Sequence, residues 1–299
     1  MAAKKVITVF GATGAQGGSV ARALLQRPGF AVRAVTRDVN RPASQALRDL
    51  GASVVKGDLD NQKSVEEAMH GAHGVFLVTN FFDSFSKEKE VQQGKMVADV
   101  AKRLGTKHVV FSGLENVKAL TCGKLEVLHF DSKGEVEQYF WDTGVPMTSV
   151  RVSFYFENFL TATKPVKAPE GDHYNLVLPM ADIPMDGISV ADIGPVVASI
   201  FQSPEGYLGK ALGLSSERLT VQQYAEILSK HMGKTVLDSK ISPENYEKLG
   251  FPGAKELADM FRFYWTKIDR DIKLTRQLNP NVKSFDQFLC ENKEALKSL

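Results

Sequence analysis

The chain has 299 residues, and its 37 Lys and Arg against 35 Asp and Glu leave a formal net charge of only +2. A chain of this length can bury about three quarters of the surface that its unfolded form exposes, which allows one large domain or a main domain with a smaller attachment. The balanced charge and the lack of a basic run argue against nucleic-acid binding as the primary activity.

Cysteine usage and hydropathy exclude further classes of protein. The two cysteines, Cys122 and Cys290, lie far apart and show no CxxC spacing, and the six histidines form no HExxH pattern. These patterns predict no metal site and free thiols in a reducing compartment. The apolar run near residue 6 is too short for a signal peptide, and no segment approaches the ~18 apolar residues of a membrane span. We therefore expect a soluble, intracellular protein without a membrane segment.

Residues 1–152 alternate short β-branched runs with longer amphipathic segments. The runs typical of buried strands lie at 6–10, 31–36, 52–57, 74–79, 108–112 and 147–152. The segments 17–27 and 87–105 between them carry apolar residues at helical spacing. Strands that alternate with helices require right-handed crossovers, so this half predicts an α/β fold, a Rossmann-type doubly wound parallel sheet.

The pattern changes after residue 152. The proline-rich segment 161–184 predicts an irregular crossing with one strand, and it is a candidate loop that becomes ordered when a ligand binds. The helical patterns that follow lie at 190–201, 221–232, 243–250, 255–265 and 285–296, with Thr220, Ser242 and Ser284 as expected N-caps. We expect residues 153–299 to form a smaller, mostly helical domain, from which a helix near 189–203 returns to the domain of residues 1–152.

A glycine-rich turn follows the first expected strand. The sequence GATGAQG places Gly11, Gly14 and Gly17 in GxxGxxG spacing, immediately before a helix. Such glycines permit a tight turn, close approach of the backbone to a pyrophosphate, and close packing of helix on strand. The helix N-terminus adds N–H groups and partial positive charge for the phosphates. The turn therefore predicts a dinucleotide-binding site.

The end of the second expected strand distinguishes the two nicotinamide cofactors. An NAD site places Asp or Glu there to bind the ribose 2′-OH, whereas this sequence has Arg37. The planar guanidinium fits a 2′-phosphate, and Arg41 could assist it. Asp38 keeps the NAD alternative open, since it would reach the ribose if the strand ended one residue later. The residues favour NADP(H).

In an open parallel sheet, ligands bind at the carboxyl ends of the strands. The residues that follow the third and fourth strands are Asp58 and Leu59, and Thr79, Asn80 and Phe81. We expect Asp58 to accept a hydrogen bond from the adenine amino group and Asn80 to bond the ribose or the nicotinamide side. Asp60 is expected to cap the helix that follows.

Several longer segments carry a family resemblance. They are GATGAQGGSV, VTR after the second strand, GD of the third, HFDSKGEVE, VPMTSVR, FYFENF, PMDGISVADIGPVV and YEKLGFPGAKELADMFRFY. Together they span essentially the whole chain and resemble the NmrA-like branch of the atypical short-chain dehydrogenases. The resemblance implies a Rossmann-type domain that prefers NADP(H), and a regulatory sensor of the NADPH/NADP+ balance. It also implies a homodimer with regulatory protein partners, in the cytoplasm with access to the nucleus.

The resemblance also implies a set of cofactor contacts. Matched by motif, they are Gly11, Thr13, Gly14, Gln16, Gly17, Arg37, Asp58, Leu59, Asn80 and Lys133, and Ala12 and Ala15 complete the loop. Tyr155, Phe156, Glu157 and Asn158 would close over the nicotinamide end. Gln62 and the segment 91–95 are further candidates, although Lys95 fits a surface role equally well.

The helix that begins near HFDSKGEVE decides whether catalysis is expected. Active short-chain dehydrogenases resemble one another in a Tyr-x-x-x-Lys pair, but here His129 stands in the place of the tyrosine and Lys133 in that of the lysine. A neutral imidazole can shuttle protons, so chemistry is not excluded, but His129 could equally only pack or form a hydrogen bond. We interpret Lys133 as a ribose ligand and Tyr155 as an aromatic cover that could also act as the acid.

Two functions remain open from the sequence. The preferred hypothesis is an NADP(H)-binding redox sensor that changes conformation or assembly, and thereby its protein contacts, with little or no turnover. The alternative is an NADPH-dependent reductase of quinones or other small carbonyl substrates, with His129, Lys133 or Tyr155 as the proton donor.

Overall fold

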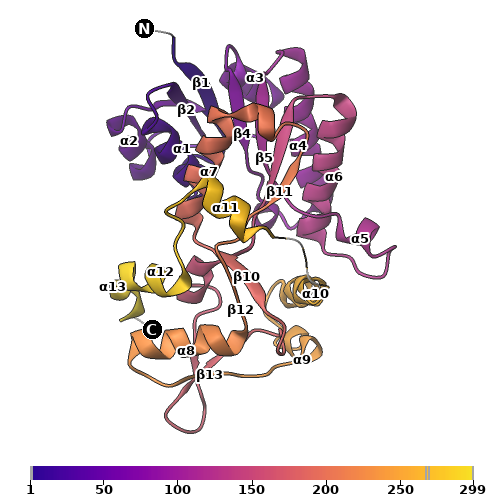
Figure 1. The fold of residues 1–299 in the computed structure, drawn as a ribbon. Helices are drawn as coiled ribbons and strands as arrows, with labels where there is room; N and C mark the ends of the chain where they lie inside the picture. The colour runs from indigo at the N-terminus through magenta and orange to yellow at the C-terminus, as the bar shows by residue number, and fades with distance from the viewer. Residues whose placement is uncertain (1–2, 267, 269, 298–299) are drawn as a thin grey trace. The chain divides into compact units, whose positions relative to one another are not determined.

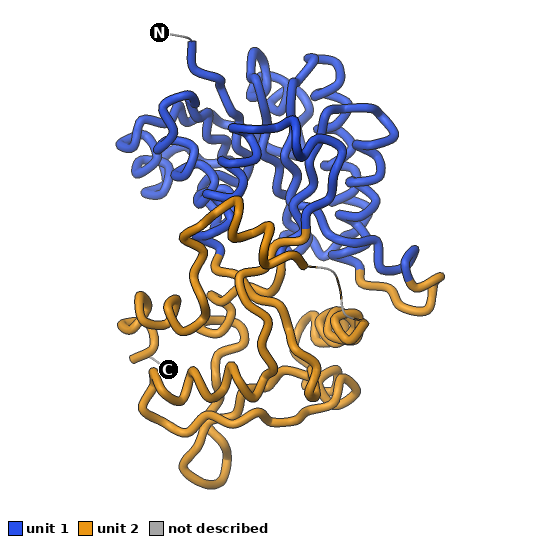
Figure 2. The backbone as a smooth tube through the Cα atoms, viewed as in Figure 1, with its two compact units in different colours: residues 1–120, 128–152, 190–212 blue, residues 121–127, 153–189, 213–299 orange. Residues whose placement is uncertain are grey.

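The computed structural model describes residues 3–266, 268 and 270–297. The chain divides into two compact units, coloured separately in Figure 2. Unit 1 contains residues 1–120, 128–152 and 190–212, and unit 2 contains residues 121–127, 153–189 and 213–299. Each unit is therefore built from segments that are distant in the sequence.

A seven-stranded sheet forms the centre of unit 1, in the order β11-β6-β5-β4-β1-β2-β3 (Figure 1). Its strands are β1 (Lys5–Val9), β2 (Phe30–Thr36), β3 (Ser53–Lys56), β4 (Gly74–Leu77), β5 (His108–Gly113), β6 (Met147–Arg151) and β11 (Ala211–Gly213). Every pair from β3 to β6 is parallel, and the strand order reverses between β1 and β4. The doubly wound sheet predicted from the sequence is confirmed.

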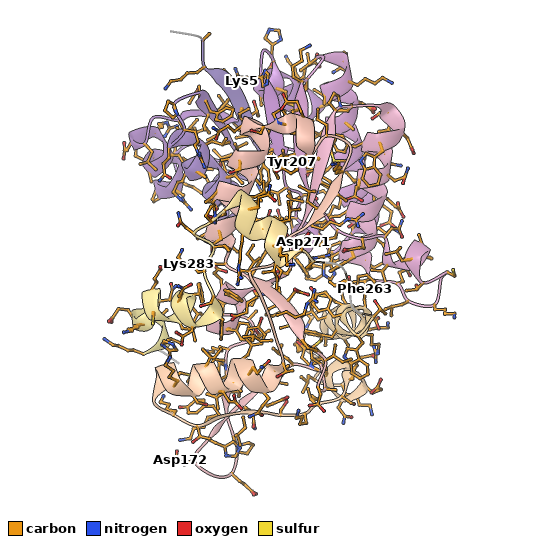
Figure 3. The ribbon with its side chains drawn as sticks, viewed as in Figure 1. Lys5, Asp172, Tyr207, Phe263, Asp271 and Lys283 are labelled. Carbon is orange, nitrogen blue, oxygen red and sulfur yellow. The ribbon has the colours of Figure 1, made fainter. Side chains whose placement is uncertain are left out.

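The edge strand β11 is the one strand of this sheet that the sequence did not reveal. Its residues, ALG, include no β-branched side chain, so they give no strand signal. The segment before it is held at the sheet edge because Thr148 Oγ1 of β6 donates to the Tyr207 carbonyl at 2.9 Å. Figure 3 labels Tyr207, and also Lys5, the first residue of β1.

Helices cover both faces of the sheet. They are α1 (Ala15–Leu25), α2 (Pro42–Asp49), α3 (Gln62–Met69), α4 (Lys87–Arg103), α5 (Val117–Leu120), α6 (Leu128–Thr143) and α7 (Val190–Gln202), with the 3-10 turns η1 (Phe81–Asp83) and η3 (Pro204–Gly206). The helices α3, α4 and α6 bury one face, where Phe111 packs with Val136 and Phe140. His108 of the same strand contacts Phe201 of α7, because residues three apart point to opposite faces.

The return of α7 to unit 1 depends on a close contact with α1. A Cβ atom on Gly194 would lie 2.2 Å from the Ser19 carbonyl oxygen, so only glycine allows the two helices to approach this closely. The Ser19 hydroxyl accepts from the Gly194 N–H at 3.0 Å and donates to the Ala191 carbonyl at 2.9 Å. This pairing satisfies backbone groups at the start of α7.

Unit 2 combines helices with two three-stranded sheets, β12-β10-β7 and β13-β9-β8. The strands are β7 (Phe154–Tyr155), β8 (Val166–Lys167), β9 (Tyr174–Leu176), β10 (Met185–Ile188), β12 (Glu217–Leu219) and β13 (Val236–Asp238), and the 3-10 turn is η2 (Phe156–Leu160). The helices are α8 (Val221–Met232), α9 (Pro243–Glu247), α10 (Ala254–Tyr264), α11 (Ile272–Leu278), α12 (Phe285–Glu291) and α13 (Lys293–Leu296). In the proline-rich segment, β8 and β9 pair antiparallel, and Figure 3 labels Asp172 in the connection between them.

The expected helix caps are confirmed at three positions. Thr220, Ser242 and Ser284 each accept a hydrogen bond from the backbone N–H three residues later. The first and third form complete capping boxes, because Gln223 and Gln287 bond back to the cap residue. None of the helices in the described part of the chain has the length and apolar composition that a bilayer crossing requires.

His108 makes the stability of unit 1 dependent on pH. It is 2% exposed, and its Nε2 lies 2.8 Å from Thr148 Oγ1. Burial lowers its pKa from 6.5 to about 4, because the imidazolium would lose its hydration. The unfolded chain therefore takes up this proton near pH 6.5, whereas the folded chain does so only near pH 4. The stabilisation is complete above pH 6.5 and is lost as the pH falls toward 4.

We expect the free energy of unfolding to fall by about 3 kcal/mol between pH 7 and pH 4 because of His108 alone. Urea unfolding at a series of pH values measures it. The His108→Gln variant should lack this part of the dependence, whereas His70→Gln, at an exposed position, should retain it. Parallel pH profiles for wild type and His108→Gln would contradict the assignment.

Candidate functional site

The glycine-rich turn joins β1 to α1 as the sequence predicted. Gly14 is the N-cap of α1, no side chain caps this helix, and its first turn contains no acidic residue. A Cβ atom on Gly17 would lie 2.2 Å from the Gly11 carbonyl oxygen, and Gly11 itself has φ +64°. The helix start is therefore pressed against the turn, which presents backbone N–H groups and the positive end of the helix dipole to an anion.

The turn lies at the point where the strand order reverses. A Cβ atom on Gly11, after β1, would meet Val78 Cγ1, after β4, at 2.8 Å. The next residue, Thr79, has a buried hydroxyl with no hydrogen-bond partner among the described residues. A buried polar atom without a partner is costly unless a ligand or a water satisfies it. The turn and this hydroxyl together fit the dinucleotide group expected at such a switch point.

Arg37 follows β2 and reaches the end of β4. Its side chain is 67% exposed, and Nη1 lies 3.2 Å from Asp83 Oδ2. Asp83 in turn accepts from Asn80 Nδ2 at 2.6 Å, and the Asn80 side chain also accepts from the Phe82 N–H. Arg37 therefore already pairs with a carboxylate, and a guanidinium can bind phosphate oxygens in the same way as carboxylate oxygens. No sequence pattern pointed to Asp83, which lies in the turn η1 after β4.

Asp38, the alternative ribose ligand, is engaged within its own loop. Its Oδ1 accepts from the Asn40 N–H at 2.9 Å, and Oδ2 lies 3.7 Å from Arg41 Nε. Arg41, the expected assistant to Arg37, is the backbone N-cap of α2 and pairs with Asp38. Of the two arginines that follow β2, Arg41 is paired with Asp38, whereas Arg37 is paired with Asp83.

The region after β3 corrects one prediction. Asp60 does not cap α3; the cap is Asn61, whose Oδ1 accepts from the Ser64 N–H at 3.0 Å. Asp60 instead pairs with Lys89 at 2.8 Å, and hydrogen bonds from Lys89 and then from Gln93 lower the pKa of its carboxyl. The helix begins one residue later than expected, so the cap moves with it.

Hydrogen bonds within a local turn hold both the side chain and the backbone of Asp58. Its Oδ1 accepts from the Asp60 N–H at 3.0 Å, and Ser64 Oγ contacts its backbone. Leu59 is half-buried, and Gln62 is an exposed residue at the start of α3. Their expected adenine contacts stay a prediction.

Lys133 is paired with an acidic residue that the sequence did not reveal as its partner. Its side chain is 12% exposed, and its ammonium forms an ion pair with Glu90 of α4, whose side chain is 1% exposed. Ser132 donates to the second oxygen of the same carboxylate. Burial lowers the pKa of Lys133, and the Glu90 carboxylate partly opposes that shift. The burial of Glu90, though not its partner, could have been predicted from helical spacing. It lies on the same buried face of α4 as Gly94, Val97 and Ala101.

His129 lies one turn before Lys133 on α6, among aromatic rings. Its ring centroid is 4.9 Å from that of Phe130, 5.4 Å from Phe82 and 6.0 Å from Phe81. The side chain is buried, with 7% of the residue exposed. The turn η1 therefore joins two parts of the site, because Asp83 pairs with Arg37 while its neighbours Phe81 and Phe82 pack on His129.

The four residues expected over the nicotinamide belong to unit 2. Tyr155 ends β7, and Phe156 is fully buried, with its ring centroid 5.1 Å from that of Phe285. Glu157 Oε1 accepts from Ser189 Oγ at 2.8 Å, and the Asn158 carbonyl accepts from two backbone N–H groups. The Phe156 ring is thus a core group of unit 2, and the role of the four residues as a cover stays a prediction.

The Glu90 carboxylate is expected to be the main support of the Lys133 ammonium. In Glu90→Gln the ammonium stays buried without a counter-charge, so unfolding should become easier by about 3–5 kcal/mol. The double variant Glu90→Gln, Lys133→Met removes both charges and should regain much of that loss. Denaturant unfolding measures both.

An exposed acidic residue supplies the control for this prediction. Glu67→Gln on α3 should leave the free energy of unfolding nearly unchanged, because Glu67 is exposed. If Glu90→Gln were as stable as Glu67→Gln, the buried pair would not carry the role assigned to it.

Comparisons with known proteins agree with this architecture. The chain is 37% identical over 254 residues to an NmrA-like family domain-containing protein of Dictyostelium discoideum, covering 82% of this chain and 83% of that protein. It is 32% identical over 281 residues to the NmrA-like family domain-containing oxidoreductase cpsB of Aspergillus campestris, covering 88% and 83%.

Solved structures share the fold. NmrA, a negative transcriptional regulator solved in complex with NADP, superposes with a TM-score of 0.82 at 23% identity, covering 98% of each chain. The NADPH-dependent quinone oxidoreductase QOR2 of Escherichia coli, solved with NADPH, gives 0.79 at 23% identity, covering 96% of this chain and 99% of that one. The sequence pattern of the NmrA-like family matches residues 3–289. The chain therefore belongs to the NmrA-like family.

Proposed function

We propose that unit 1 binds NADP(H) and that the chain acts as a redox sensor, with little or no turnover. The observation that carries the proposal is the position of Arg37 at the end of β2, next to a glycine turn whose helix no side chain caps. The turn would hold the pyrophosphate and Arg37 the 2′-phosphate that separates NADP(H) from NAD(H). NmrA and QOR2, which share the fold, were solved with such cofactors.

The low turnover is inferred from the α6 residues. When bound, the nicotinamide of NADPH supplies a hydride, and a reductase must add a proton to the substrate. His129, which replaces the tyrosine, packs against Phe82 and Phe130 and is buried. Lys133 has its ammonium paired with Glu90. In this arrangement Lys133 holds the ribose, and neither side chain is presented as an exposed proton donor.

A sensor must couple the cofactor to a change that a partner can detect. The ion pair between Arg37 and Asp83 offers a coupling to occupancy of the site, since the 2′-phosphate, which NADPH and NADP+ share, would compete with Asp83 for the guanidinium. A response to the NADPH/NADP+ ratio would further require the nicotinamide end of the site to bind the two forms with different affinities. Asp83 belongs to η1, whose Phe82 packs on His129, so release of the carboxylate would alter this turn. The change in conformation or in homodimer assembly would then alter regulatory protein contacts in the cytoplasm, and in the nucleus if the protein enters it.

A second function is supported by the names of the relatives. The fungal relative cpsB is named an oxidoreductase, and QOR2 is an NADPH-dependent quinone oxidoreductase of the same fold. In that case His129, Lys133 or Tyr155 would deliver the proton to a quinone or to another small carbonyl substrate. The two functions share the cofactor and differ in turnover.

One experiment separates the two functions. Purified protein is titrated with NADPH and with NADP+, and light scattering follows the assembly state. NADPH absorbance is then followed with a panel of quinones and carbonyl compounds. Binding with a change in assembly and no turnover supports the sensor. Turnover within the ordinary enzymatic range of about 1–10³ per second would overturn the sensor and support the reductase.

Arg37 and Asp83 are expected to change cofactor preference in opposite directions. Arg37→Asp removes a charge-assisted contact to the 2′-phosphate, so NADPH binding should weaken about 10- to 100-fold. Asp83→Asn removes the competing carboxylate but keeps a side chain that can bond Asn80, so NADPH should bind roughly 2- to 5-fold more tightly. NADH, which lacks the 2′-phosphate, is the matched control in fluorescence titrations. Equal effects on both cofactors would refute these roles.

A further inference from the structure

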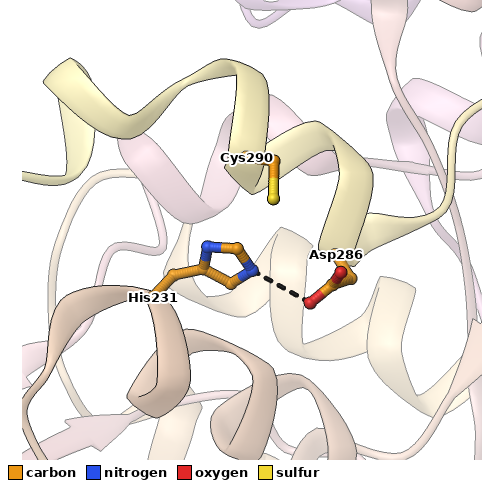
Figure 4. A group of neighbouring side chains, drawn as sticks. All are labelled: His231, Asp286 and Cys290. Carbon is orange, nitrogen blue, oxygen red and sulfur yellow. Dashed lines mark hydrogen bonds and ion pairs between the residues drawn. The ribbon is translucent and has the colours of Figure 1, made fainter.

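Three side chains of unit 2 that the cofactor site does not use converge between α8 and α12. Figure 4 shows the imidazole of His231 facing the carboxylate of Asp286, with the Cys290 sulfur directed toward the ring. One nitrogen, one oxygen and one sulfur atom of these residues all lie within 4.8 Å of one another. The closest pair is His231 Nε2 and Asp286 Oδ1, at 2.9 Å. Three different ligand types thus face one small space.

The helices fix the backbone of all three residues. His231 lies in the last turn of α8, while Asp286 and Cys290 lie one turn apart on α12, on the same side of that helix. The helix α12 begins with the Ser284 capping box, and its Phe285 packs on Tyr224 of α8 with ring centroids 4.9 Å apart. The backbone positions of the three residues are therefore set by the packing of α12 on α8.

The spacing is close to that of a tetrahedral zinc site. Zinc bonds of ordinary length place nitrogen and oxygen ligands about 3.3 Å apart, and nitrogen and sulfur ligands about 3.6 Å apart. The nitrogen and oxygen, now 2.9 Å apart, would separate by a few tenths of an ångström. The sulfur would move inward by at most about 1.2 Å from the 4.8 Å limit, which a rotation of the exposed Cys290 side chain can supply.

We propose that His231, Asp286 and Cys290 bind a zinc ion, with water in the fourth position. A thiolate, an imidazole and a carboxylate form a donor set that suits zinc better than magnesium or calcium, which prefer oxygen ligands. The proposal does not depend on NADP(H) binding. It differs from the sequence-based expectation of no metal site, because His231 and Asp286 are 55 residues apart and form no compact motif.

The charges around the site both favour the metal and compete with it. On metal binding, His231 Nε2 would exchange its contact with Asp286 Oδ1 for a bond to the ion, and any proton on that nitrogen would be released. Lys230 Nζ lies 2.8 Å from the same oxygen that would bind zinc. The Lys230 side chain is 68% exposed, so it can move into solvent at little cost when the ion binds. His231, with its side chain 6% exposed, stays in place.

The test uses the full chain, reduced and freed of metal with a chelator, and cobalt(II) as the spectroscopic probe. One equivalent of cobalt should produce thiolate charge-transfer absorption and the visible bands of a tetrahedral ion, and zinc should remove both. Cys290→Ser should abolish the thiolate band. Cys122→Ser, at the other exposed cysteine, is the matched control and should retain it.

Two further variants keep the test decisive. His231→Gln removes a direct ligand, so it should weaken cobalt binding by more than the roughly 10- to 100-fold that losing an outer-shell partner costs. Lys230→Gln should strengthen binding, because it removes the competing ammonium, whereas a purely structural cluster predicts no such gain. A wild-type chain without a thiolate band, or a band that Cys122→Ser abolishes and Cys290→Ser does not, would overturn the proposal.

Discussion

The close contact between the start of α1 and the turn that precedes it is the constraint on which unit 1 depends. No side chain larger than hydrogen fits at Gly17, because a Cβ atom would lie 2.2 Å from the Gly11 carbonyl oxygen. This contact directs α1 back along the sheet, where Ser19 bonds the backbone of α7. The same geometry leaves the helix start without a side-chain cap, at the switch point of the strand order. Packing and anion binding thus arise from one feature.

Arg37 and Lys133, two cationic side chains of the candidate site, each have a carboxylate partner. Arg37 pairs with Asp83 at the surface, and Lys133 pairs with Glu90 in the interior. The two pairs differ in their consequences. The exposed pair holds little energy and can be exchanged for a phosphate, whereas the buried pair is expensive to break and fixes the α4–α6 contact. In the proposed function, cofactor specificity would therefore belong to Arg37 and Asp83, while the buried pair of Lys133 and Glu90 would stay in place.

His129, at the position where the family resemblance implies a tyrosine, determines what α6 would offer to a bound cofactor. An exposed phenol would present an O–H to a substrate, but this imidazole packs among Phe81, Phe82 and Phe130. The rings that surround it belong partly to η1, which also carries Asp83. The position for which the resemblance implies a catalytic tyrosine therefore packs, in this chain, on the turn that contacts Arg37.

The sequence determined the elements whose signals are local. Alternating β-branched runs and helical spacing gave six strands of the sheet, and the Thr220, Ser242 and Ser284 caps followed from short-range backbone chemistry. The GxxGxxG spacing and Arg37 pointed to the dinucleotide site because strand, turn and helix occur within one short segment. Glu90 could also have been recognised, since an acidic residue on an apolar helical face needs a buried partner.

The tertiary structure decided every feature that depends on pairing between distant residues. The sequence around β11 does not show that this strand pairs with β6. Likewise, the sequences around Asp83 and Glu90 do not show that they pair with Arg37 and Lys133. His231 and Asp286 meet only because α12 packs on α8. Such contacts arise when the core closes and brings together side chains separated by tens of residues. The sequence fixes the chemistry of each side chain, and the packing of the elements selects which of them meet.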